Sequence, residues 1–225
     1  MKNIVSVKKC VLRDTLQYQG EPLLTYKIEY PEFCSPCFNA CLNKINRFYR
    51  QKALDYQKYC SSVLFSMAVE QYRYAVDNGF PFNAFEAMEV YAVTYLRACI
   101  ISVFFDRYQF TGGAHGSTVR SSQSWNLWEC AQLELSHLVR CAPDYKTYIL
   151  AAVEAQIKSE PEIYFENYKE LIAETFNAAS FYCKPQGLVV YYQQYDIAPY
   201  SSGIREVLIP YTGCVLNPIR LCCRP

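Results

Sequence analysis

Two runs of alternating residues in the middle of the chain restrict its fold more than any other feature. In Phe82–Leu96 the side chains of Tyr91, Val93 and Tyr95 fall on one face of an extended segment, because successive residues of a strand point to opposite sides. Ile100–Tyr108 alternates in the same way, and the link between the two runs is short enough for a hairpin. The sequence therefore predicts an antiparallel pair of strands here.

Other segments with the same character lie on both sides of this pair. Short runs rich in β-branched and aromatic residues, bounded by glycine or proline, are typical of strands. By this criterion Gly20 joins two N-terminal strands, Pro31 ends the second, and Pro185-Gln186-Gly187 forms a hairpin turn. The further predicted strands are Asn3–Arg13, Leu23–Tyr30, Ser117–Trp125, Phe181–Lys184, Leu188–Tyr192 and Glu206–Ile209.

A helical pattern replaces the alternation between residues 35 and 77. Pro36 suits the first turn of a helix, and Asn78-Gly79 supplies a stop signal. Because the segment is unusually long, we expect a bend or break near Cys60-Ser61-Ser62. A stripe of apolar side chains at three- and four-residue steps is expected to pack against a sheet: Leu42, Ile45, Phe48 or Tyr49, Tyr56, Tyr59, Val63, Met67 and Tyr74.

Together these elements predict an α+β fold, with antiparallel sheets packed against one long helix from the N-terminal half and two or three shorter helices. The shorter helices are expected at Leu135–Val139, Asp144–Lys158 and Asn167–Thr175, with His137 on an apolar helical face. A chain of 225 residues with 52% hydrophobic residues can bury a substantial core. We expect two αβ modules, residues 1–116 and 117–225, within one compact unit.

Charge and hydropathy narrow the choice of partners. The formal net charge is +1, so the composition gives no sign of a basic surface that would bind nucleic acid or an anionic membrane. No run of about 18 uninterrupted apolar residues, as a membrane span requires, is present. Lys8, Lys9 and Arg13 interrupt the apolar residues that a secretory signal needs. If Met1 is the native start, this predicts a cytoplasmic protein.

The chain is cysteine-rich, with twelve cysteines, and we interpret most of them as reduced, buried apolar side chains, because disulfide frameworks belong to short secreted domains that lack a core. Cys34, Cys37 and Cys41 would share one face of a helix, and three thiolates could bind zinc. The alternative is a cysteine-rich packing face, since no pair supplies a fourth ligand. We predict no cofactor, and we expect Cys222-Cys223 in an exposed tail.

Two loops carry the candidate site residues. The glycine loop, Thr111–Gly116, contains Gly112, Gly113, His115 and Gly116, and the tyrosine loop, Gln193–Gly203, contains Asp196, Pro199, Tyr200 and Gly203. Glycines at a sharp bend allow close backbone approach, and a histidine among them could bind a metal, act as a general base or contact a partner. His115 could equally be a turn residue that only forms a hydrogen bond.

The two loops also appear in an ordered set of motifs. FFDRYQFTGGAHG is followed by a strand, a short helical segment, YKEL at Tyr168–Leu171, a Gln-Gly turn and QQYDIAPYSSG. From Leu23 to Pro210 this set resembles the domain-of-unknown-function family shared by the lysozyme-sensing anti-sigma factor RsiV and the accessory region of the peptidoglycan deacetylase PdaC. The resemblance implies a bacterial α+β module that binds a protein or cell-wall glycan without catalysing deacetylation. It also implies an extracellular location, as in secreted relatives, if Met1 is not the native start.

Three functions remain open. The first is a non-catalytic binding or sensing module that recognises a protein or glycan through both loops, whose tyrosines offer large amphipathic contact areas. The second is a hydrolase that uses His115 with Asp106 or Asp196. The third is a self-associating structural protein, because 21 tyrosines exceed what the core needs and surplus aromatic residues can form a homodimer.

Overall fold

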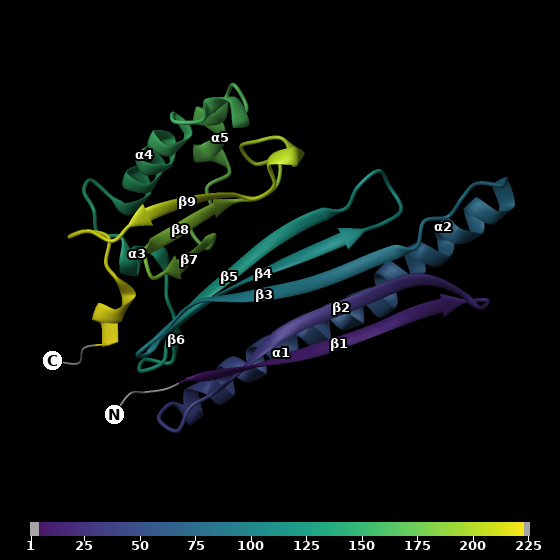
Figure 1. Ribbon diagram of the computed structural model, residues 1–225, viewed down its shortest axis with the longest axis horizontal. Coiled ribbons are helices and arrows are strands. Elements are labelled where there is room, and N and C mark those ends of the chain that lie inside the picture. The colour runs from purple at the N-terminus through teal and green to yellow at the C-terminus, as the bar shows by residue number, and fades with distance from the viewer. Residues whose placement is uncertain (1–4, 223–225) are drawn as a thin grey trace. The chain divides into compact units, whose positions relative to one another are not determined.

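The computed structural model describes residues 5–222 and divides them into two compact units (Figure 1). The N-terminal unit comprises Val5–Tyr91 and Asp106–Thr118, and the C-terminal unit comprises Ala92–Phe105 and the chain from Val119 onward. The strands form a six-stranded sheet in the order β1-β2-β3-β4-β5-β6 and a three-stranded sheet in the order β7-β8-β9. The predicted α+β fold, with one long helix and several shorter ones, is confirmed.

The first sheet contains the predicted central hairpin. Its strands are β1 Ser6–Tyr18, β2 Glu21–Cys34, β3 Phe85–Arg97, β4 Ile100–Phe110, β5 Ser117–Asn126 and β6 Ala131–Gln132. The two residues between β3 and β4 are Ala98, which has a positive φ of 53°, and Cys99. A link of this length joins antiparallel neighbours, so the interpretation of the two alternating runs is confirmed.

The N-terminal hairpin is longer than predicted. Gln19 and Gly20 form its turn with φ values of 54° and 90°, and β1 pairs with β2 from Ser6 opposite Cys34 to Tyr18 opposite Glu21. The prediction that Pro31 ends the second strand is therefore wrong. The residues of β2 that pair with β3 are Leu24–Ile28, so the missing N–H of Pro31 falls outside the β2–β3 ladder, where a proline is tolerated.

One pairing departs from the antiparallel arrangement that the sequence predicts. Strands β2 and β3 are parallel, with Leu24 opposite Phe85 and Ile28 opposite Glu89. Parallel neighbours need a long crossover connection, and the long helical segment between β2 and β3 supplies it. This connection lays the helix over the sheet, so that both contribute to the core of the N-terminal unit.

The long helical segment has three parts: α1 Asn39–Tyr59, a π-helical stretch Cys60–Leu64, and α2 Phe65–Asn78. The predicted break near Cys60 is therefore confirmed. Gly79 ends α2 in the left-handed conformation, with φ 68°, a common helix C-terminus. The helix begins at Asn39, later than Pro36 suggests, because Pro36 lies in a bend that precedes it.

The π-helical stretch determines which side of α2 is buried. The buried residues Tyr56, Cys60, Leu64 and Ala68 are each four positions apart. An α-helix has 3.6 residues per turn, so residues spaced by four would gradually move to another side of a regular α-helix. A wider π turn absorbs this drift. The predicted stripe is correct at Leu42, Ile45, Tyr49 and Tyr56 but wrong beyond Tyr56: Tyr59, Val63, Met67 and Tyr74 are 37%, 48%, 45% and 63% exposed.

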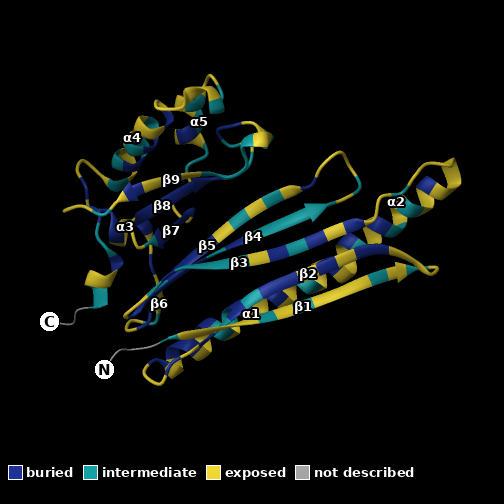
Figure 2. Ribbon diagram, viewed as in Figure 1, coloured by how far each residue is buried: buried dark blue, intermediate teal, exposed yellow. Residues whose placement is uncertain are grey.

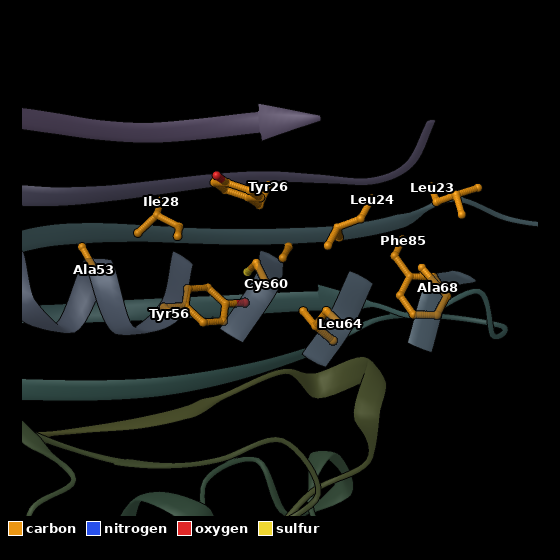
Figure 3. Packing of buried hydrophobic residues seen from close by; sticks show 11 residues of the cluster. Leu23, Leu24, Tyr26, Ile28, Ala53, Tyr56, Cys60, Leu64, Ala68 and Phe85 are labelled. Carbon is orange, nitrogen blue, oxygen red and sulfur yellow. The ribbon is translucent and has the colours of Figure 1, made fainter. Parts of the chain in front are cut away.

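The core of the N-terminal unit lies between β2, β3 and this helical segment (Figure 3). Side chains of β2 and Phe85 of β3 meet residues of the helical segment, each with at most 3% of its surface exposed. The members are Leu23, Leu24, Tyr26, Ile28, Ala53, Tyr56, Cys60, Leu64, Ala68, Phe85 and Ala87. Strand β1 carries no member of this cluster, and most of its residues are exposed (Figure 2).

The C-terminal unit adds a second sheet and three α-helices. The strands are β7 Phe181–Lys184, β8 Gly187–Tyr192 and β9 Arg205–Pro210, and the helices are α3 Leu135–Leu138, α4 Tyr145–Ile157 and α5 Tyr168–Glu174. All three strands pair antiparallel, and β8 is buried along its whole length (Figure 2). The predicted hairpin at Pro185-Gln186 and the predicted helices are confirmed. His137 is not in a core: it is exposed and caps α3, where its Nδ1 accepts a hydrogen bond from Glu134 N–H at 3.1 Å.

Disulfides correct the interpretation of the cysteines. Cys99 is bonded to Cys222, and Cys141 is bonded to Cys214, across 123 and 73 residues of chain. Cys41 and Cys130 are also disulfide-bonded. Cys222 is therefore not part of a free tail, and Cys223 lies outside the described residues. Since disulfides persist in oxidising compartments, these bonds indicate an oxidising environment and disfavour the cytoplasm. Among the helices of residues 5–222, none is long and apolar enough to cross a membrane.

Candidate functional site

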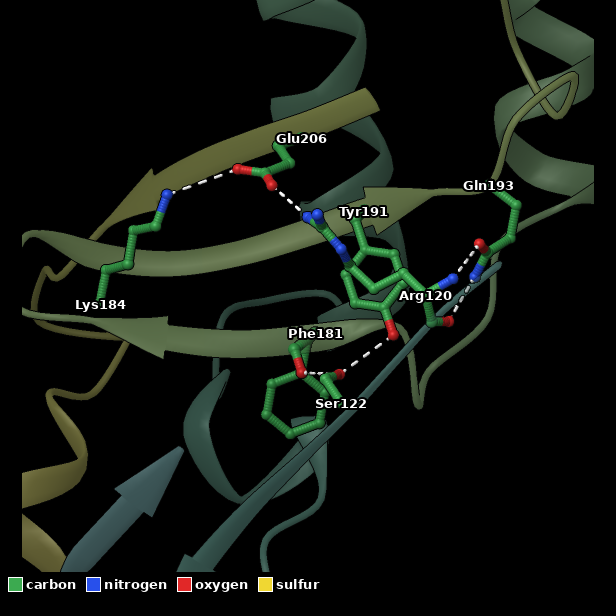
Figure 4. A network of polar contacts seen from close by, with 7 residues as sticks. All are labelled: Arg120, Ser122, Phe181, Lys184, Tyr191, Gln193 and Glu206. Atoms are coloured by element: carbon green, nitrogen blue, oxygen red, sulfur yellow. Dashed lines mark hydrogen bonds and ion pairs between the residues drawn. The ribbon is translucent and has the colours of Figure 1, made fainter. Parts of the chain in front are cut away.

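The base of the tyrosine loop is anchored to β5 by a side-chain amide. Gln193 Oε1 accepts a hydrogen bond from the main-chain N–H of Arg120 at 2.8 Å, and Gln193 Nε2 donates one to the main-chain O of Arg120 at 2.8 Å (Figure 4). Gln193 directly follows β8. The amide thus satisfies both polar groups of one residue of β5, much as a further strand would.

The side chain of Arg120 points into the same region. Its guanidinium lies 3.9 Å from the centroid of the Phe104 ring and forms an ion pair with Glu206 of β9, while only 9% of the Arg120 side chain is exposed. Lys184 contacts the other carboxylate oxygen of Glu206 at 3.4 Å. A cation that is paired and stacked in this way is well compensated for its burial. Figure 4 shows that β5, β7, β8 and β9 all contribute to this network.

The loop then folds back on itself. Asp196 Oδ2 accepts a hydrogen bond from the main-chain N–H of Gln193 at 2.6 Å, a turn that aspartate favours. Burial raises the pKa of Asp196 above its ordinary value, against the effect of this hydrogen bond. The next two residues, Ile197 and Ala198, are 0% and 1% exposed. The loop is therefore held to the unit on both sides of Tyr195.

Tyr195 is the residue that this arrangement presents to solvent. It has a positive φ of 67°, which is uncommon for a residue with a side chain, and it is 56% exposed. Its ring lies 5.8 Å from the ring of Tyr200, at 34° to it. Tyr200 begins a single 3₁₀ turn after Pro199, and Gly203 ends that turn with φ 64°. Two tyrosine rings are thus held together on a loop with fixed ends.

The glycine loop is shaped by close packing within the N-terminal unit. A Cβ at Gly112, whose φ is 82°, would lie 2.9 Å from Gln71 Nε2 of α2. A Cβ at Gly116 would overlap the ring of Tyr108 and lie 2.6 Å from the main-chain O of Gln109, both in β4. These two glycines allow the loop to lie against α2 and β4. Gly113, by contrast, would have no neighbour within 4 Å of an added Cβ.

His115 is exposed in this loop, and its Nδ1 lies 3.1 Å from the main-chain O of Gly116. Asp106 belongs to the same unit, in β4, whereas Asp196, Pro199, Tyr200 and Gly203 belong to the C-terminal unit. The two predicted sets of site residues are therefore parts of different units. The catalytic roles of His115, Asp106 and Asp196 stay predictions.

The candidate zinc ligands are not arranged as the sequence suggested. Cys34 is the last residue of β2, Cys37 lies in the connection after it, and only Cys41 lies in α1. Cys41 is disulfide-bonded and so cannot provide a thiolate. Within residues 5–222, no group of three or more histidine, cysteine, aspartate or glutamate side chains could hold a metal ion.

Sequence reasoning identified the tyrosine loop but not the two residues that organise it. Gln193 and Tyr195 were not among the candidates, because a glutamine that bonds to the main chain of Arg120, 73 residues away, leaves no local pattern. The one signal in the sequence was Asp196, because an aspartate just after a strand favours a tight turn. Such a turn can place the preceding residue, Tyr195, on the surface.

Two family models match successive parts of the chain. Residues 18–118 match the family described as Deacetylase PdaC, and residues 138–212 match the family described as protein of unknown function DUF3298. No curated protein matches the chain.

Two solved structures share the fold. A DUF3298-family member from Bacteroides fragilis has a TM-score of 0.74 at 17% identity, covering 93% of this chain and 92% of its own. A DUF3298-family protein from Pseudomonas aeruginosa has a TM-score of 0.60 at 18% identity, covering 93% and 91%. The family that the sequence resembles is thus confirmed: the chain carries a PdaC-type segment followed by a DUF3298 segment.

Proposed function

We propose that this chain is a non-catalytic binding module that recognises a protein or a glycan through its tyrosine loop. The observation that carries the proposal is Tyr195, which is 56% exposed although residues on both sides of it are anchored. Gln193 is bonded to Arg120, and Ile197 is completely buried. The glycine loop, with His115 exposed, is the second candidate contact surface.

The rigidity of the loop favours recognition. Ordering a flexible side chain on binding costs about 0.5–1.5 kcal/mol, and a loop that already holds its aromatic rings avoids much of that cost. Tyrosine combines an apolar ring with a hydroxyl, so the Tyr195–Tyr200 pair can stack on a sugar or fill an apolar patch of a protein while forming hydrogen bonds at its edge.

The expected partner follows from the family and from the disulfides. Residues 18–118 match a family named after the deacetylase PdaC, and the resemblance noted in the sequence includes a lysozyme-sensing protein. The disulfides favour an oxidising environment, which supports an extracellular module that meets cell-wall glycans or secreted proteins. We therefore take peptidoglycan and lysozyme as the two probes.

The test compares Tyr195→Ala and Tyr200→Ala with Tyr74→Ala, which removes an equally large tyrosine, 63% exposed, from α2 of the other unit. Co-sedimentation with insoluble peptidoglycan and calorimetric titration with lysozyme measure the two kinds of partner. We expect one probe to bind the unchanged chain and to bind each loop variant at least about tenfold more weakly, which is about 1.4 kcal/mol. Equal binding by all variants, or binding of neither probe, would overturn the proposal.

Self-association is a second candidate, favoured by the apolar stripe that the π turn leaves on the outer face of the helical segment. Val63, Met67 and Tyr74 are 48%, 45% and 63% exposed. Phe80, just beyond the end of α2, is 59% exposed, and its ring lies 6.2 Å from that of Tyr74. Light scattering over a range of concentrations tests this candidate. A dimer that Met67→Glu dissociates and Tyr195→Ala leaves intact would assign the contact to this stripe.

A further inference from the structure

We propose that Cys34 and Cys37 form a redox-active dithiol pair that exchanges with external disulfides. The two residues belong to the sequence Cys34-Ser35-Pro36-Cys37, which connects β2 to α1. Both thiols are free and exposed, whereas six other cysteines are in disulfides. A C-x-x-C spacing is the spacing of disulfide oxidoreductases, because it allows two sulfurs to meet across a short turn.

The local structure forms such a turn. Ser35 is 5% exposed, and its Oγ accepts a hydrogen bond from the main-chain N–H of Cys37 at 3.3 Å. The chain bends at Pro36 and Cys37 before α1 begins at Asn39. The bend anchors the middle of the motif through a buried serine and leaves the cysteines at its two ends accessible to solvent.

The other free cysteines of the described chain are protected from the same chemistry. The thiolate is the nucleophile in disulfide exchange, and burial raises the pKa of Cys60 to about 11 and that of Cys183 to about 12. Burial, with a contribution from Glu32, also raises the pKa of Cys10. Reactivity toward external disulfides is therefore concentrated at the two exposed thiols of the C-x-x-C segment.

The exchange consists of two balanced steps. The thiolate of one cysteine attacks a sulfur of an external disulfide, forms a mixed disulfide and expels the other sulfur as a thiolate. The second cysteine, deprotonated, attacks the protein sulfur of that mixed disulfide, so that the Cys34–Cys37 bond forms and the second external thiolate leaves. Two protein thiols are oxidised, and one external disulfide is reduced to two thiols. The reverse sequence returns the pair to the dithiol.

The experiment incubates the full chain in mixtures of reduced and oxidised glutathione, blocks free thiols with iodoacetamide and maps tryptic peptides by mass spectrometry. Cys34, Cys37 and Cys41 lie in one peptide, residues 28–44. We expect a Cys34–Cys37 disulfide to appear reversibly as the oxidised fraction rises, while Cys99–Cys222 and Cys141–Cys214 remain unchanged. Cys34→Ser and Cys37→Ser should each retain glutathione as a mixed disulfide on the remaining cysteine. Cys10→Ser, the control, should form the pair as before.

Three results would overturn the proposal. Glutathione attached to both cysteines of the unchanged chain, with no bond between them, would show that the sulfurs do not meet. A bond from either cysteine to Cys41 would show that the segment rearranges a structural disulfide instead of forming its own. Thiols that remain unmodified at every glutathione ratio would show that the pair does not exchange at all.

Discussion

Gln193 and Arg120 are joined through two hydrogen bonds of 2.8 Å each, from the side-chain amide of the first to the main-chain N–H and O of the second. Gln193→Glu keeps the shape of the side chain but removes the Nε2 donor. We expect this variant to lose about 1–3 kcal/mol of folding free energy, because the main-chain O of Arg120 loses its partner and a carboxylate enters the same place. Urea unfolding measures the loss. Gln186→Glu, at an exposed position in the turn between β7 and β8, is the control and should change stability less.

The phase of the helical segment can be tested with adjacent residues. Leu64 is 2% exposed and Val63 is 48% exposed. Leu64→Ala should cost about 2–5 kcal/mol because it leaves a cavity against the sheet, whereas Val63→Ala should stay within about 0.5 kcal/mol of the unchanged chain. Thermal unfolding followed by circular dichroism distinguishes these values. A larger loss at Val63 would mean that the π turn does not shift the buried face.

The glycine loop offers a second matched pair. Gly116→Ala places a methyl group against the Tyr108 ring and 2.6 Å from the main-chain O of Gln109, so we expect a loss of about 1–3 kcal/mol from overpacking. Gly113→Ala meets nothing within 4 Å and should be close to neutral. Denaturant midpoints for the two variants provide the measurement. Equal midpoints would show that the loop is free to move away from β4.

Stability at acid pH should depend on Glu29. Its carboxylate accepts hydrogen bonds from Lys27 at 2.8 Å and from Lys9 at 2.7 Å. The Lys27 hydrogen bond and then the Lys9 hydrogen bond outweigh burial and lower the pKa of Glu29 below its ordinary value. A lowered folded-state pKa stabilises the protein above the ordinary glutamate pKa, and that stabilisation is lost as the pH falls through the folded value.

We therefore expect Glu29→Gln to be less stable than the unchanged chain at neutral pH, by a difference that shrinks below about pH 4. Urea unfolding at a series of pH values measures this difference. Lys27→Met should reduce it, since it removes the larger cause of the shift. A constant difference at all pH values would assign the effect of Glu29 to packing and not to its charge.

Local patterns predicted most of the secondary structure. The β3–β4 hairpin follows from alternation and a short link, and the break at Cys60 follows from the length of the helical run. The outer side of α2 was misassigned because steps of three and four residues fit two neighbouring stripes equally well. Only the packing of Leu64 and Ala68 against β2 and β3 selects one of them.

Long-range pairings could not be derived in the same way. Cys99 and Cys222 are 123 residues apart, and two cysteines bond only if the fold brings their Cβ atoms within a few ångströms. Likewise, Leu24 of β2 lies opposite Phe85 of β3 because the long helical segment connects the end of β2 to the start of β3 and lets the two strands run parallel. The loops of the candidate site were recognisable from their residue types. The hydrogen bonds between Gln193 and Arg120 were not, because they form only where the end of β8 lies beside β5.

The Cys141–Cys214 bond encloses α4, α5, β7, β8, β9 and the whole tyrosine loop in one covalent ring. A protease that nicks this loop after Tyr195 would therefore leave both pieces attached to each other. The cut chain would migrate as an intact protein in a non-reducing gel and would separate into two fragments only after a reductant breaks the Cys141–Cys214 bond.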